Sequence, residues 1–142
     1  MSERYRRLGK DTLGKGGYGY VHAAWDAKES CLVAVKTQPS DSDEAVREMM
    51  FFQSIPGHKH LLKILDFYAE KNDLNLVCEY LYNSLSDLFH RAQGLLHVPV
   101  ARDYSWQVLQ GLAHLHSHRV AHRDLSMGNM LVGTPSNTLK IC

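Results

Sequence analysis

Three short stretches of the sequence carry residue types that could bind or transfer a phosphate group. The first is the run Gly14-Lys15-Gly16-Gly17-Tyr18-Gly19, with Val21 two residues further on. Glycines lack a Cβ, so backbone amides in such a run can approach phosphate oxygens closely. A plain β-turn between two strands would explain the same residues. The strand-turn-strand setting argues against a Rossmann dinucleotide site, which needs a helix directly after the glycines.

The second stretch is Val33-Ala34-Val35-Lys36, which places a lysine at the end of an apolar strand. A lone lysine in that place commonly extends its charged end into water. Its position after the glycine run is also where a lysine that pairs with phosphate oxygens would lie. Glu48, in the middle of the next predicted helix, is then its natural ion-pair partner, although Glu48 could instead pair on a solvated helix face. We predict an ion pair between Lys36 and Glu48.

The third stretch is His122-Arg123-Asp124-Leu125-Ser126-Met127-Gly128-Asn129. Asp124 and Asn129 in one ordered loop could direct a carboxylate at a hydroxyl group and a carboxamide at a metal ion. An exposed polar turn is the alternative. The neighbouring His114, His116 and His118 do not converge on one helix face, so a metal site built from them is not favoured. His122 is instead predicted to brace the loop.

The elements that must position these stretches change type along the chain. Strands are predicted over 8–13, 20–25, 31–36, 61–68 and 74–80, helices over 43–54, 84–93 and 99–116, and two further strands over 130–132 and 138–142. Ser42 is a predicted N-cap of the first helix, in which Val46, Met49, Met50 and Gln53 share one face. In the longest helix, the helical periodicity places Tyr104, Val108, Leu112 and Leu115 on one apolar face.

Composition narrows the class of protein. The 142 residues contain 16 Lys and Arg against 15 Asp and Glu, and 44% of them are hydrophobic. These values are typical of one globular domain or part of a larger one, and they favour neither a nucleic-acid nor a membrane partner. The cysteines Cys31, Cys78 and Cys142 are too widely spaced for a disulfide framework. With no signal peptide or apolar span visible, an intracellular location in the cytoplasm, the nucleus or both is expected.

Taken in order and with their separations, the three stretches resemble the eukaryotic protein kinase family from about Tyr5 to Cys142. Residues 107–124, Gln-Val-Leu-Gln-Gly-Leu-Ala-His-Leu-His-Ser-His-Arg-Val-Ala-His-Arg-Asp, are most similar to the cyclin-dependent kinases and their neighbours. The resemblance implies an α+β, protein-kinase-like fold: a five-stranded antiparallel sheet with one helix, followed by the start of a helical lobe. Residues 1–81 would form the N-terminal lobe and hinge, and residues 82–142 the part that contains the catalytic loop.

The resemblance also implies ATP and Mg²⁺ as cofactors and a role for each matching residue. Asp124 would accept the proton of a substrate hydroxyl, Asn129 would bind Mg²⁺, and Lys36, oriented by Glu48, would hold the α- and β-phosphates. Cys78 would precede the hinge at Glu79-Tyr80-Leu81. Tyr18 matches an inhibitory phosphorylation site of the family, and an aromatic cap on the glycine loop is the alternative. The residues that would bind ATP are Leu13, Gly14, Lys15, Gly16, Gly17, Tyr18, Gly19, Val21, Ala34, Lys36, Glu79, Leu81 and Leu131.

Two departures from the family pattern bear on the activity that the resemblance implies, which is transfer of the ATP γ-phosphoryl group to Ser or Thr hydroxyls of proteins. Ser126 occupies the place of a lysine, and the loss of that cation would cost about 2–4 kcal/mol, or roughly 10²–10³ in rate. The sequence ends at Cys142, before an Asp-Phe-Gly motif that would supply the other Mg²⁺ ligand. We therefore expect a truncated and inactive form.

A non-catalytic kinase-like regulatory or binding module is the alternative function. Ala45-Val46-Arg47-Glu48 is similar to the end of the cyclin-facing helix of the family. The expected partners are therefore protein substrates and, as a further candidate, a cyclin-like activator.

Overall fold

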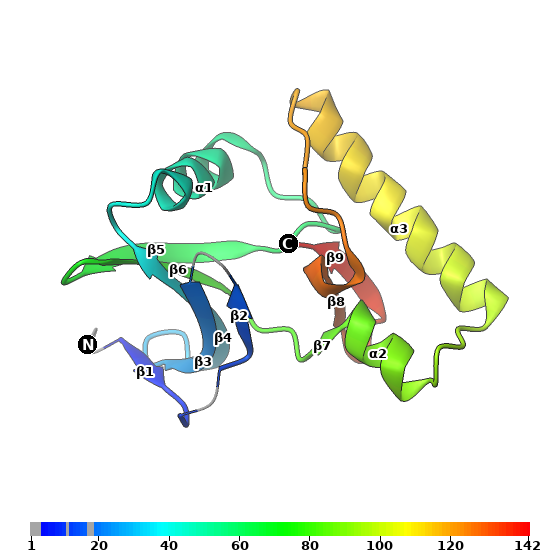
Figure 1. Ribbon diagram of the computed structural model, residues 1–142, viewed down its shortest axis with the longest axis horizontal. Helices are drawn as coiled ribbons and strands as arrows, with labels where there is room; N and C mark the ends of the chain where they lie inside the picture. The colour runs from blue at the N-terminus through cyan, green and yellow to red at the C-terminus, as the bar shows by residue number, and fades with distance from the viewer. Residues whose placement is uncertain (1–3, 11, 17–18) are drawn as a thin grey trace. The chain divides into compact units, whose positions relative to one another are not determined.

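The chain divides into two units in the computed structural model, which describes residues 4–10, 12–16 and 19–142 (Figure 1). The sheet unit comprises Met1–Ser54 and Lys63–Tyr80, and the helical unit comprises Ile55–Leu62 and Leu81–Cys142. Gly17 and Tyr18 lie outside the described residues, as do the side chains of residues 15, 16, 44 and 51–53.

The sheet unit is built on one antiparallel sheet. Its strands are β1 (Tyr5–Arg7), β2 (Gly14–Gly16), β3 (Gly19–Asp26), β4 (Cys31–Pro39), β5 (Ile64–Glu70) and β6 (Asp73–Glu79). They lie in the order β1-β3-β4-β6-β5, with β2 also paired to β3. The predicted strand over 8–13 is wrong, because Gly9 has a φ of 69° and the strand is interrupted there. β1 and β2 lie on either side of that break.

The core of the sheet unit forms from the branched side chains that favour strands. Val33, Val35 and Val77 are fully buried and pack with Ala24 and Tyr5. Because Val33 and Val35 alternate along β4, Ala34 and Lys36 project from its opposite face. The same alternation that builds the core therefore places the lysine of the second stretch on the other face of the sheet.

Helix α1 (Asp43–Ser54) has the bounds that the sequence predicts, and the Ser42 side chain accepts a hydrogen bond from the amide of Ala45. The face that carries Val46 and Met50 is exposed, at 41% and 62% for these two side chains, whereas Ala45 is buried. The side chain of Gln53 lies outside the description. The orientation of α1 follows from its polar contact with the sheet, because Glu48 on α1 pairs with Lys36 on β4.

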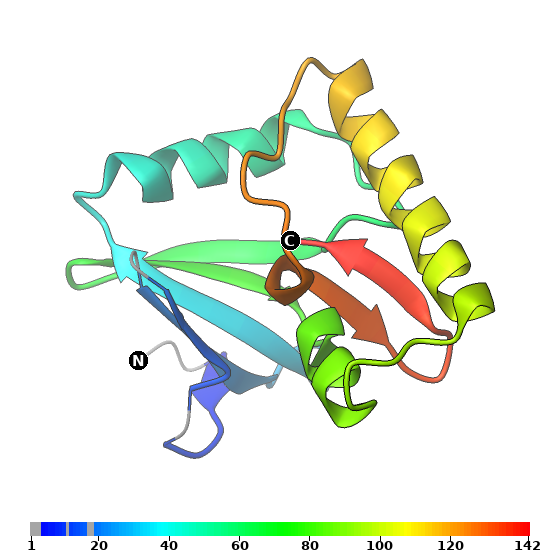
Figure 2. The same ribbon diagram turned by 45° about the vertical axis from the view of Figure 1, so that its right-hand side comes forward.

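The helical unit combines a three-stranded sheet with two helices (Figure 2). Its elements are β7 (Asn83–Ser84), α2 (Leu85–Arg91), α3 (Val98–Ser117), the short 3₁₀ helix η1 (Met127–Asn129), β8 (Met130–Gly133) and β9 (Thr138–Ile141). Ser84 caps α2 in a capping box with Asp87. The strand predicted over 61–68 begins only at Ile64, because the backbone of Leu61 and Leu62 pairs with Ile141 at β9.

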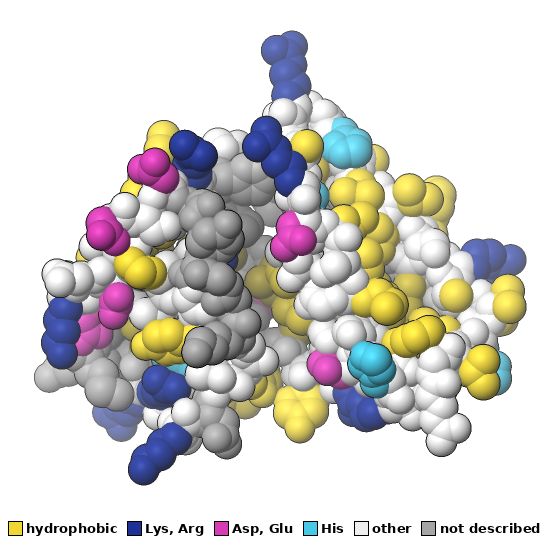
Figure 3. Space-filling model, viewed as in Figure 1, with side chains coloured by type: hydrophobic (Ala, Val, Ile, Leu, Met, Phe, Trp, Pro, Cys, Tyr) yellow, Lys and Arg dark blue, Asp and Glu magenta, His cyan; other side chains and the backbone are white. Residues whose placement is uncertain are grey.

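The predicted apolar face of the longest helix is confirmed in α3. Tyr104 and Leu115 are buried, and Val108 and Leu112 pack against the same core, which also contains Leu85, Val132, Leu139 and Ile141. The opposite side of α3 exposes Val98, Trp106 and Leu109, and Figure 3 shows hydrophobic side chains on this part of the surface. None of the helices in the described part of the chain has the length and hydropathy needed to span a bilayer.

Substitution of Gly111 by alanine is expected to destabilise the helical unit. A Cβ on Gly111 would lie 2.9 Å from the His60 carbonyl oxygen and 3.0 Å from Ile141 Cδ1. The higher helix propensity of alanine stabilises by up to about 1 kcal/mol, but overpacking of this kind costs about 1–3 kcal/mol. The oxygen cannot move aside freely, because it accepts the Ile141 amide at 3.0 Å. The measurement is the urea midpoint, which should fall for Gly111→Ala.

Gly57→Ala in the same unit is the matched control, because a Cβ at Gly57 would have no atom within 4 Å. Its urea midpoint should remain at the wild-type value. A Gly111→Ala protein as stable as the wild type would contradict the close approach of α3 to residue 60.

Candidate active site

The glycine run forms a hairpin within the sheet unit. Gly14 pairs with Val21 and Gly16 with Gly19, while Gly17 and Tyr18 lie outside the described residues. Gly19 has a φ of 153°, and a Cβ there would lie only 2.1 Å from the Thr37 carbonyl oxygen. A Cβ at Gly14 would meet nothing within 4 Å. The strand β3 begins at Gly19, so the glycines are followed by a strand and not by the helix that a Rossmann site would require.

The residues expected to lie around the adenine come partly from one face of this sheet. In the strand register, Val21 is the cross-strand neighbour of Lys36, and Ala34 is that of Cys78. Cross-strand neighbours lie on the same face of a sheet. Leu13 is half exposed, and its amide bonds to the carbonyl oxygen of Val21. Val21, Ala34 and Lys36 are therefore brought onto one surface of the sheet unit.

The expected hinge residues end β6. Glu79 closes the pairing with Lys63, whose carbonyl oxygen accepts the Glu79 amide at 3.0 Å and whose amide donates to Glu79 Oε1 at 2.7 Å. Leu81 and Leu131 belong to the helical unit, where both are half-buried. Leu131 lies on β8 opposite Ser84.

The predicted ion pair between Lys36 and Glu48 is confirmed. Lys36 Nζ lies 2.8 Å from Glu48 Oε1 and 2.6 Å from Oε2, and the two side chains are 33% and 27% exposed. Gln38 adds a contact that the sequence reasoning missed: its Nε2 donates to Glu48 Oε2 at 2.7 Å. The available signal was its spacing, since Gln38 follows Lys36 by two residues on one strand and so shares its face.

The loop of the third stretch lies in the helical unit and is held by side-chain hydrogen bonds. Asn129 Nδ2 donates to both the carbonyl oxygen and Oδ2 of Asp124, each at 2.8 Å. His122 Nε2 donates to the Cys142 carbonyl oxygen at 3.0 Å, so its Nδ1 is left to accept the amide of Asp124 at 3.3 Å. The predicted bracing role of His122 is thereby confirmed. Arg123, between them, has a φ of 67°.

This geometry leaves the Asp124 carboxylate and the Asn129 Oδ1 atom as acceptors for a ligand. Asp124 is exposed, and its carboxylate can accept a proton or a hydrogen bond from a hydroxyl group. Because the amide nitrogen of Asn129 is committed to Asp124, its Oδ1 is the atom left for a ligand, and amide oxygens suit hard cations such as Mg²⁺. Ser126 is exposed and makes no side-chain capping bond at η1. The donor set therefore fits a loop that binds a metal ion and a hydroxyl group.

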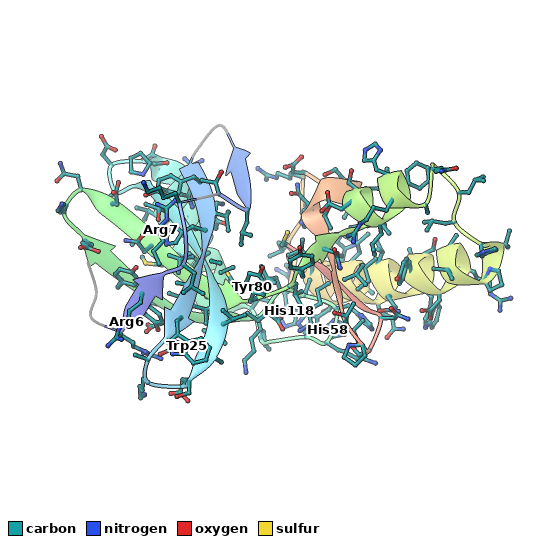
Figure 4. All side chains as sticks on the ribbon, turned by 90° about the horizontal axis from the view of Figure 1, so that it is seen from below. Arg6, Arg7, Trp25, His58, Tyr80 and His118 are labelled. Atoms are coloured by element: carbon teal, nitrogen blue, oxygen red, sulfur yellow. The ribbon has the colours of Figure 1, made fainter. Side chains whose placement is uncertain are left out.

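The histidines near the end of α3 stack on one another. The rings of His58 and His114 lie 4.7 Å apart and nearly parallel, and the ring of His118 lies 4.6 Å from that of His114. His58 and His118 are labelled in Figure 4. Burial, with His114 and His60 nearby, holds the pKa of His58 below its ordinary value. Among the described residues, no group of three His, Cys, Asp or Glu side chains is arranged to hold a metal ion. The stack packs residues 55–62 on α3.

Comparison with known proteins agrees with the fold and with these motifs. The protein kinase domain, as a family, matches residues 8–142. A "Cell division control protein 2 homolog 3" from Trypanosoma brucei brucei is 34% identical over 145 residues, which cover 98% of this chain and 45% of that protein. The chain thus spans about half the length of this relative. It belongs to the protein kinase family.

Proposed function

We propose that this chain is the ATP-binding and catalytic-loop part of an intracellular protein kinase that phosphorylates Ser and Thr residues of other proteins. The observation that carries the proposal is the arrangement of Asp124 and Asn129: an exposed carboxylate held by a carboxamide whose oxygen is left for a metal ion. The closed Lys36–Glu48 pair in the sheet unit supports it.

In the proposed reaction, the side chains of this chain bind, orient and accept a proton. Lys36 binds the α- and β-phosphates of ATP, and Glu48 keeps its amine in place. Asp124 orients the substrate hydroxyl and takes its proton as the oxygen bonds to the γ-phosphorus and the bond to the leaving ADP breaks. Asn129 Oδ1 would be a ligand of Mg²⁺, which when bound offsets the negative charge of the phosphate oxygens.

Adenine is proposed to bind against Leu13, Val21 and Ala34 of the sheet unit. The backbone of Glu79 and Leu81 supplies its hydrogen bonds. Protein substrates are the proposed partners. A cyclin-like activator is a second candidate, because the relative is named for cell division control and because Val46 and Met50 expose an apolar face of α1.

The test of the proposal is phosphate transfer by the full-length protein that contains these residues. Radiolabelled ATP is supplied with casein as a Ser/Thr substrate and with a Glu–Tyr copolymer as a Tyr substrate, and the labelled amino acids are identified after hydrolysis. Label on serine and threonine is the expected result. Label confined to tyrosine would refute the Ser/Thr preference.

A non-catalytic module remains the second candidate, and Ser126 is the observation that favours it, since a serine cannot neutralise a transferring phosphoryl group. A protein that binds ATP with Mg²⁺ but transfers no label to either substrate would support this module. Failure to bind ATP at all would refute the kinase proposal.

Ser126→Lys is expected to increase the transfer rate by at least about tenfold, because a preformed cation at a phosphoryl group contributes about 10²–10³ in rate. The substitution removes no capping bond from η1, so the loop should keep its form. Ser136→Lys, in the exposed turn between β8 and β9, is the matched control and should leave the rate unchanged. A rate unaffected by Ser126→Lys would show that this position does not face the transferred group.

A further inference from the structure

The buried side chain of Gln38 contacts both the carboxylate that pairs with Lys36 and the hairpin formed by β2 and β3. It is only 3% exposed, and its Nε2 donates to Glu48 Oε2 at 2.7 Å. Its Cγ lies 3.1 Å from the position that a Cβ on Gly19 would occupy, at the end of the glycine hairpin. One side chain of β4 thus lies between that hairpin and the carboxylate that pairs with Lys36.

The carboxylate of Glu48 receives two kinds of donor from β4. Lys36 is charged and contacts both oxygens, at 2.8 and 2.6 Å, whereas Gln38 is neutral and contacts Oε2 alone. A bound phosphate is anionic, as Glu48 is, so the two anions compete for the positive charge of Lys36. The neutral amide of Gln38 carries no charge for a phosphate to attract, so its bond to Glu48 is kept when Lys36 turns toward an anion.

We propose that Gln38 is a positioning residue for nucleotide binding: its amide holds Glu48, and with it α1, against β4 so that Lys36 stays oriented. Its kinetic consequence rests on the proposed function, but the contact itself does not. The charged groups that the structure places around Gln38 are Lys36, Glu48 and, across a shallow pocket that Gln38 also lines, Asp41 and Asp73. A second carboxylate at position 38 would therefore meet mostly negative charge.

The first experiment measures the freedom of Lys36 without any need for ATP. The protein is treated briefly with an amine-reactive N-hydroxysuccinimide ester, and labelling of Lys36 relative to exposed Lys28 is read by peptide mass spectrometry. Gln38→Leu should raise the relative labelling of Lys36 by about tenfold, the factor expected from loss of one hydrogen bond to a charged group. Relative labelling at the wild-type value in Gln38→Leu would overturn the proposal.

Thr37→Val is the matched control, because it removes another buried side-chain hydrogen bond from the same strand, that of Thr37 Oγ1 to Asn75 Oδ1 at 2.7 Å. A general loosening of the sheet would raise Lys36 labelling in Thr37→Val as well, and that result would also overturn a specific role for Gln38. Gln38→Glu is a second test variant, because glutamate has nearly the same shape as glutamine but replaces the donor amide with a carboxylate.

Two carboxylates side by side raise the pKa of one of them, so in Gln38→Glu a proton shared with Glu48 should restore the contact near about pH 6. Because an added carboxylate beside Lys36 by itself lowers the reactivity of the amine, Gln38→Glu is compared with wild type in the transfer assay and not by labelling. In the transfer assay, the kcat of Gln38→Leu should fall about tenfold and stay low at every pH. The kcat of Gln38→Glu should fall at about pH 8 and return toward the wild-type value as the pH is lowered to about 6. A wild-type protein without transfer activity would refute the proposed function, while the labelling result would still decide the role of Gln38.

Discussion

Asp124→Asn is expected to lower the rate of phosphate transfer by about 10²–10⁴, the range that a positioned general base contributes. The carboxamide that replaces the carboxylate cannot take a proton from the substrate hydroxyl. It can still accept the hydrogen bond from Asn129 Nδ2, which now joins the two side chains at 2.8 Å, so the loop should keep its form. The affinity for an ATP analogue should therefore stay close to wild type while kcat collapses.

Asp103→Asn is the matched control for this substitution. Asp103 on α3 is also exposed and also accepts a carboxamide nitrogen, that of Gln107, at 2.8 Å. The same change of atoms at that position should leave kcat unchanged. If both variants lost activity equally, or if Asp124→Asn kept full activity, Asp124 would not be the base.

Lys36→Met is expected to reduce kcat/KM by about 10²–10³, the cost of removing one preformed positive group that faces developing negative charge. Methionine keeps most of the length and the apolar stem of lysine but loses the amine. Glu48 would then keep only Gln38 as a donor among the contacts that the described residues make to it. Both the affinity for ATP and the rate should fall, in contrast to Asp124→Asn, which should affect the rate alone.

The control for charge removal is Lys28→Met. Lys28 also contacts a glutamate, Glu29, at 3.4 Å, but the two side chains are 69% and 58% exposed, and such surface pairs contribute little. Activity and ATP affinity should be those of the wild type. An effect of Lys36→Met no larger than that of Lys28→Met would contradict the assignment of Lys36 to the phosphates.

Residues close together in the sequence could be interpreted well from the sequence itself. The bounds of α1 follow from the Ser42 cap and from Pro56-Gly57 beyond its end, and the buried face of α3 follows from its helical periodicity. The interruption of the first strand was missed, because a single glycine with a positive φ ends a strand only where the backbone adopts that conformation.

The chemical motifs and the periodicities of the long elements were determined by the sequence alone, because they depend on residue type and short-range spacing. Tertiary structure decided which face of α1 turns to the sheet, since Glu48 is drawn to Lys36 and Gln38 while Val46 and Met50 are left exposed. It also assigned residues 55–62 to the helical unit, where Leu62 bonds to Ile141. The Lys36–Glu48 pair could be predicted from residue type and order, but the exposure of Val46 and Met50 and the pairing of residues 60–62 with Ile141 rest on contacts between residues far apart in the chain.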